Sequence, residues 1–125
     1  MWHDLIDCAF IRWALGILMY EMLTCKTPFE DTARKEEATM RNILKQPLEF
    51  PSENSVFDET KKSFLSSLLQ KNPLERLGSE YQDPDQVAKH PYFASLSFEA
   101  IASRTAPVPW VPELAATTDS SYFDA

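Results

Sequence analysis

The segment from Phe10 to Thr24 constrains this chain most, because it predicts a helix that is apolar on nearly every face. A helix without a polar face belongs in the interior of a larger structure rather than on its surface. Only Arg12 and Glu21 interrupt the run, and the apolar stretch is too short to cross a bilayer comfortably. The N-terminus carries aspartates where a secretory signal needs Lys or Arg. We therefore predict a buried core helix and no membrane span.

Size and charge narrow the possible functions. A chain of 125 residues has room for one small domain. Its net charge of −7 argues against nucleic acid or an anionic membrane as the main partner, because phosphate-binding surfaces need a basic excess. Cys8 and Cys25 lack metal-site or redox spacing, so we interpret them as free thiols of a cytoplasmic protein, with the nucleus as a second location.

The rest of the chain predicts shorter helices and then a tail. Residues 1–11 show no pattern of their own. After the core helix, capping residues and helical spacing predict four more helices. The first runs from Asp31 to Leu44, the third from Asp83-Pro84 to His90, and the fourth from Ser97 through Arg104. The second is opened by Ser55 and Asp58, and its predicted buried face consists of Phe57, Phe64, Leu65, Leu68 and Leu69. From Thr105 on, Pro107, Pro109 and Pro112 impose an extended path. The predicted fold class is all-α with an extended, proline-containing tail.

Several segments, in order, resemble one protein family. They are Trp13-Ala14-Leu15-Gly16 with Tyr20-Glu21-Met22-Leu23, then Thr27-Pro28-Phe29, then Asn42-Ile43-Leu44, then Leu68-Leu69-x-Lys71-x-Pro73-x-x-Arg76-Leu77-Gly78, and finally His90-Pro91-Tyr92-Phe93. Together with a proline-rich tail ending in Ser-Tyr-Phe-Asp, they resemble the AGC serine/threonine protein kinases. The resemblance implies a divergent segment at 1–11, part of the helical C-terminal lobe of a kinase domain at 12–93, and a truncated AGC tail at 94–125.

The resemblance also implies roles for single residues. Trp13, Gly16 and His90 match structural positions of the family, and Arg76 matches an arginine that forms a buried ion pair with a glutamate. No Ala-Pro-Glu sequence supplies that glutamate here, so we expect Arg76 to be solvated. In the tail, Pro109 and Pro112 resemble an element that lies against the N-terminal lobe, and Phe123 resembles a phenylalanine at the edge of the adenine pocket.

Two positions depart from the family pattern. The family has an aspartate where this chain has Ile11, and that aspartate braces the catalytic loop. The family usually has a glycine after the central helix, where this chain has Cys25 and the backbone needs a positive φ. Both changes remove a feature that matters only when a catalytic loop is present.

The chemistry of phosphoryl transfer is missing from these residues. The chain has two glycines, Gly16 and Gly78, so no glycine-rich phosphate loop exists, and there is no Asp-Phe-Gly. His3-Asp4 matches part of a catalytic loop by chance, because the residues that should follow it are absent. We therefore assign no catalytic or metal-binding residue. ATP and Mg²⁺ are implied by the resemblance alone, and neither is expected to bind these residues by themselves.

Two functions remain open. The chain is either a kinase fragment that is inactive alone, or a non-catalytic module that binds a kinase N-terminal lobe, a regulator, a substrate or a chaperone. If about five large side chains of the core helix stay in water, at roughly 2 kcal/mol each, the loss is about 10 kcal/mol. That equals the net stability of a typical domain, so we predict an aggregation-prone chain unless residues 1–11 fold back over the helix.

Overall fold

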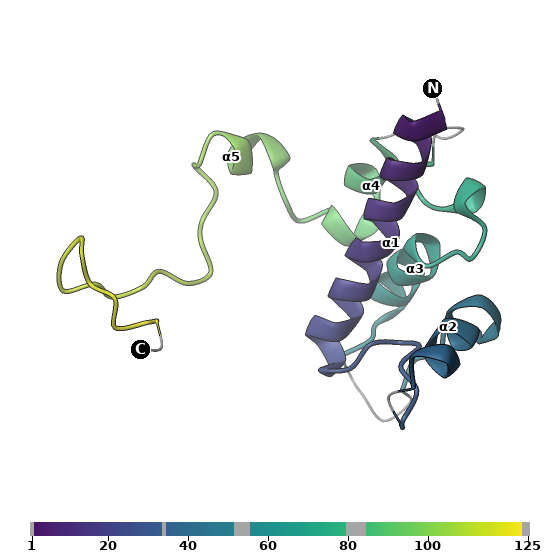
Figure 1. Ribbon diagram of the computed structural model, residues 1–125. Coiled ribbons are helices and arrows are strands. Elements are labelled where there is room, and N and C mark those ends of the chain that lie inside the picture. The colour runs from purple at the N-terminus through teal and green to yellow at the C-terminus, as the bar shows by residue number, and fades with distance from the viewer. Residues whose placement is uncertain (1, 34, 52–55, 80–84, 124–125) are drawn as a thin grey trace.

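The computed structural model describes residues 2–33, 35–51, 56–79 and 85–123. In these ranges the chain is helical and contains no strand, which confirms the predicted all-α class. Loops and two short 3-10 turns join the α-helices (Figure 1). The bounds are α1 Trp2–Thr24, α2 Glu36–Lys45, α3 Glu59–Leu68, η1 Pro73–Glu75, α4 Gln86–Lys89, η2 Pro91–Phe93 and α5 Phe98–Ala102. Among the described residues, none of these helices is long and apolar enough to cross a membrane.

Helix α1 begins at Trp2, so the predicted start at Phe10 is wrong. The residues before Phe10 contain neither proline nor glycine, and a weak hydrophobic pattern alone does not stop a helix. These residues therefore lengthen the helix instead of folding back over it. The C-terminal end at Thr24 is confirmed. Cys25 follows with φ +58°, so the positive φ of the family's glycine position persists here, and the expectation that Cys25 removes this requirement is wrong.

The core lies between α1 and α3 (Figure 1). All five residues predicted to form the buried face around α3 are buried, and Leu65 and Leu68 are fully enclosed. Tyr20 of α1 packs against Phe57, with ring centroids 5.6 Å apart, and its hydroxyl donates to the Glu49 carbonyl at 3.0 Å. Burial raises the pKa of the Tyr20 hydroxyl. Helix α1 thus contributes one face to the core.

The predicted start of the second helix is also wrong. Helix α2 begins at Glu36 rather than after Asp31, because the Asp31 carboxylate accepts hydrogen bonds from the Ala33 and Lys35 amides and closes a turn before the helix. The predicted starts at Ser55 and at Asp83-Pro84 fall outside the described residues. Helix α4 begins at Gln86.

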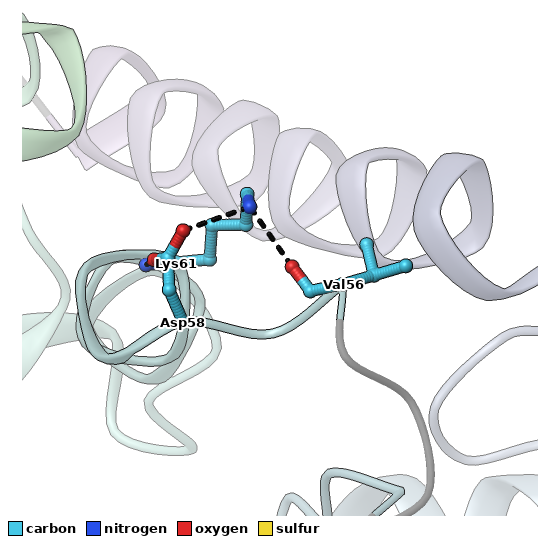
Figure 2. A network of polar contacts seen from close by, with 3 residues as sticks. All are labelled: Val56, Asp58 and Lys61. Carbon is cyan, nitrogen blue, oxygen red and sulfur yellow. Dashed lines mark hydrogen bonds and ion pairs between the residues drawn. The ribbon is translucent and has the colours of Figure 1, made fainter.

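Helix α3 begins at Glu59 with Asp58 as its N-cap. The Asp58 carboxylate accepts the Lys61 amide at 2.8 Å. Figure 2 shows the Lys61 ammonium between this carboxylate and the Val56 carbonyl, at 2.8 and 2.9 Å. The hydrogen bonds from Lys61 lower the pKa of Asp58, which keeps the cap ionised at the positive end of the helix.

The tail leaves the helical body after η2 (Figure 1). Ser97 caps α5, as predicted, by accepting the Ala100 amide at 3.1 Å. Beyond α5 the tail closes a loop of its own, in which the Trp110 and Tyr122 rings meet edge to face with centroids 5.5 Å apart. Asp119 holds this loop through its carboxylate, which accepts the Ala115 and Ser121 amides at 2.9 Å each.

Candidate functional site

Arg76 is buried, with 9% of its surface exposed, so the prediction that it is solvated is wrong. It follows η1, which Asn72 caps and Pro73 starts after α3 ends. Backbone carbonyls replace water around the guanidinium: Nε donates to Gln70 at 2.8 Å, Nη1 to Ala9 at 2.9 Å and Nη2 to Lys71 at 3.4 Å. An arginine can therefore be buried without an anionic partner when neutral acceptors surround it.

Aromatic rings hold this arginine and a neighbouring lysine. The Trp13 ring lies 4.8 Å from Arg76 Cζ and stacks on Phe29 with centroids 5.7 Å apart. Lys71 Nζ lies 3.5 Å from the Phe29 centroid, is buried, and has no hydrogen-bond partner. Burial lowers the pKa of both Lys71 and Arg76. We call Trp13, Phe29, Lys71 and Arg76 the cation cluster.

A cavity of about 240 Å³ opens beside the cation cluster. Its walls are mainly apolar and come from α1, α2 and the segment after α3: Phe10, Trp13, Ile43, Leu44, Lys71 and Arg76. In the part of the chain that the structure describes, none of the ion pairs involves Lys71 or Arg76. Two cations without a counter-charge, next to an apolar cavity, suit a carboxylate carried on an apolar stem.

A second cavity, of about 510 Å³, is acidic and was not predicted. Glu21 at the end of α1, Glu30 in the loop and Glu36 at the start of α2 line it, together with Thr27, Thr39 and Met40. The sequence indicates Glu36 only as a favourable charge at a helix start, and it gives no sign that the fold brings Glu21 beside it. Such a cavity attracts a cationic group.

Gly16 and His90 have structural roles, as the resemblance implies. Gly16 lets α1 approach α3, because a Cβ on it would lie 2.8 Å from Leu69 Cδ2. His90 Nδ1 accepts the Tyr92 amide at 3.2 Å, and the imidazole ring packs against Phe64 with centroids 4.9 Å apart. Burial lowers the pKa of His90, so the imidazole stays neutral as an acceptor.

Comparison with known proteins decides the family. Residues 8–93 match the model of the protein kinase domain. The chain belongs to the protein kinase family. It is 34% identical over 112 residues to a RAC serine/threonine-protein kinase of Drosophila melanogaster, and 36% identical over 112 residues to the serine/threonine-protein kinase YPK1 of Saccharomyces cerevisiae. A ribosomal protein S6 kinase 2 alpha of Xenopus laevis is 34% identical over the same length.

This kinase-family chain spans only part of its relatives. Each of the three alignments covers 90% of the chain, but 18%, 15% and 15% of the Drosophila, yeast and Xenopus proteins. These relatives are AGC-type kinases, the group that the sequence motifs resemble.

The tail residues do not join the cation cluster in this kinase-family chain. Pro109 and Pro112 are exposed, and Phe123 is 78% exposed. Among the described residues, no group of three His, Cys, Asp or Glu side chains is arranged to hold a metal ion. Phe123 remains a predicted nucleotide contact by resemblance alone.

Proposed function

We propose that these 125 residues are part of the C-terminal lobe of an AGC-type serine/threonine protein kinase, followed by the first part of its tail, and that they do not transfer phosphate by themselves. One observation carries this proposal: the protein kinase match falls on the helical body around α1, in a chain that lacks the motifs for nucleotide and metal. A cytoplasmic location, with the nucleus as an alternative, is part of the proposal.

In this proposal the helical body is a scaffold and a docking surface. The cavity beside the cation cluster receives the carboxylate of a kinase segment outside these residues, as the family position of Arg76 implies. Two observations support this docking. The buried Arg76 guanidinium donates to neutral carbonyls, and the adjacent Lys71 ammonium has no hydrogen-bond partner. ATP and Mg²⁺ belong to other parts of a complete kinase. The protein partners are then a kinase N-terminal lobe, a regulator or a chaperone.

A phosphotransfer assay tests the proposal directly. The purified chain is incubated with radiolabelled ATP, Mg²⁺ and a mixture of serine- and threonine-containing peptides, beside an intact AGC kinase as the positive control. We expect no incorporation above that of an Asp4→Asn variant purified in the same way, because Asp4 is the one aspartate in a catalytic-loop-like sequence. Turnover that survives repeated purification and disappears in Asp4→Asn would refute the proposal.

The acidic cavity favours a second candidate function, a module that binds a basic peptide. Three glutamates around about 510 Å³ provide the complementary charge. Fluorescence anisotropy with a labelled arginine-rich peptide measures this at two salt concentrations. Glu36→Gln removes a charge from the cavity wall, whereas Glu37→Gln removes one from the same first turn of α2 outside that wall. We expect only Glu36→Gln to weaken binding beyond the common effect of salt, and equal losses would exclude this function.

A further inference from the structure

A cavity lies between α5 and the proline segment that follows it. Its volume is about 680 Å³, within the range of sites that hold small molecules. The cavity is in the tail, beyond the residues that match the protein kinase domain. It is therefore separate from the cation cluster and from the acidic cavity, and an inference about it does not depend on the proposed function.

The end of α5 sets the position of the cavity walls. Arg104 adopts φ +58° and ends the helix, with its amide donating to the Ile101 carbonyl at 3.1 Å. The Thr105 and Ala106 amides both donate to the Ala100 carbonyl, at 2.8 and 3.0 Å. This pattern is a Schellman motif, which fixes the direction in which the chain leaves a helix. Prolines at 107 and 109 then keep the following segment extended over the cavity.

The cavity walls are mainly apolar, with two serines, Ser95 and Ser97, and one cation among them. Leu96 is 51% exposed, Ile101 46% and Val108 66%, so each leaves apolar surface in water at the cavity. Arg104 also lines the cavity, and none of the ion pairs among the described residues involves it. Apolar walls favour an apolar body, and a lone guanidinium favours a carboxylate that accepts two of its N–H groups.

We propose that this cavity binds a small carboxylic acid with an aliphatic chain. The chain displaces water from the surfaces of Leu96, Ile101 and Val108, and the carboxylate pairs with Arg104. Charge complementarity selects the ligand class: a neutral aliphatic molecule of equal length fills the same walls but leaves the guanidinium without a partner.

Isothermal titration of the full chain with decanoate, kept below its micelle concentration, tests the proposal. We expect saturable binding to one site, and binding of 1-decanol about tenfold weaker, because a charge-assisted hydrogen bond is lost. Arg104→Gln weakens decanoate binding by about the same factor, whereas Arg41→Gln, on α2 and outside this cavity, leaves it unchanged.

A matched pair of valines tests the apolar wall. Val108 and Val111 are almost equally exposed, at 66% and 64%, but only Val108 lines the cavity. We expect Val108→Asp to abolish decanoate binding and Val111→Asp to preserve it. Both side chains lie outside the buried core, so neither variant disturbs folding of the helical body. Equal binding by the two variants, no binding by the unmodified chain, or equal affinity for decanoate and decanol would each overturn the proposal.

Discussion

Replacing Gly16 by Ala tests how closely α1 and α3 pack. In an exposed helix interior this change stabilises a protein by about 1 kcal/mol, because alanine loses less backbone entropy on folding than glycine. Gly16 is instead buried against α3. An added Cβ would lie 2.8 Å from Leu69 Cδ2, 2.9 Å from Leu69 Cγ and 3.2 Å from Leu68 Cβ. Because ordinary contact begins at 3.4 Å, the two helices must separate or Leu69 must change rotamer.

The neighbours of Gly16 have little room to move. Leu68 is fully buried and Leu69 is 4% exposed. Overpacking of such a site costs about 3 kcal/mol, at the upper end of the usual range. Subtracting the helix-propensity gain of about 1 kcal/mol leaves a net loss of about 2 kcal/mol in the free energy of unfolding. For a chain of this size that loss lowers the melting temperature by roughly 8 °C.

Urea unfolding followed by circular dichroism at 222 nm measures the effect. Ala14 lies on the exposed side of the same helix, so Ala14→Gly reports helix propensity alone and is expected to cost about 1 kcal/mol. A Leu69→Ala background removes the two closest atoms and leaves only the 3.2 Å approach to Leu68 Cβ, so Gly16→Ala is expected to lose most of its cost there. If Gly16→Ala stabilises the unmodified chain, the close approach of α1 and α3 does not exist in solution.

Three further predictions concern the end of α1, the His90 cap and the exposed face of α1. Cys25→Gly relieves the positive φ and is expected to raise the free energy of unfolding by about 1 kcal/mol in urea titrations, whereas Cys25→Ala is expected to give no gain. The lowered pKa of His90 means that the unfolded chain binds more protons than the folded chain, so the free energy of unfolding falls as pH drops below the usual histidine pKa. His90→Asn keeps a cap acceptor and is expected to flatten this pH dependence between about pH 5 and 7. An unchanged slope would contradict the role of His90. The double variant Leu18→Lys, Met22→Lys is expected to raise solubility, measured by light scattering, without lowering the unfolding midpoint, because these side chains are 54% and 75% exposed. A large loss of stability would show that this side of α1 is covered in the folded chain.

The buried side of the helical body follows from sequence because it depends on local periodicity. Phe64, Leu65, Leu68 and Leu69 repeat at helical spacing, and one helix face accounts for all of them. The burial of Arg76 does not follow in this way. It depends on the Ala9 carbonyl of α1, far away in the sequence, and on a ring from the same helix. Local patterns do not report which distant acceptor will replace a missing carboxylate.

The two cavities beside the helical body were missed for the same reason. The residues that line each cavity come from at least two elements that are far apart in the sequence. The charge of each cavity comes from side chains that have no distinguishing local pattern: a glutamate at a helix start in one, and a lysine before a turn in the other. Helix starts are also hard to place. Asp31 has the chemistry of an N-cap but uses it in a turn, because two amides reach its carboxylate before α2 begins.

Helix α1 has two faces with opposite consequences. One face carries Gly16 and Tyr20 into the core with α3. The other leaves five large apolar side chains between 40% and 75% exposed: Phe10, Ile11, Leu15, Leu18 and Met22. The chain exposes 10033 Å² in all, whereas a compact protein of 14.3 kDa exposes about 6,800 Å², and both this face and the exposed tail contribute to the excess. The five side chains match the number assumed in the stability prediction, whose loss of about 10 kcal/mol equals the stability of a domain. Because α1 continues to Trp2, residues 2–11 do not fold back over this face, and a surface supplied by another part of a kinase or by a partner protein is expected to add stability by covering it.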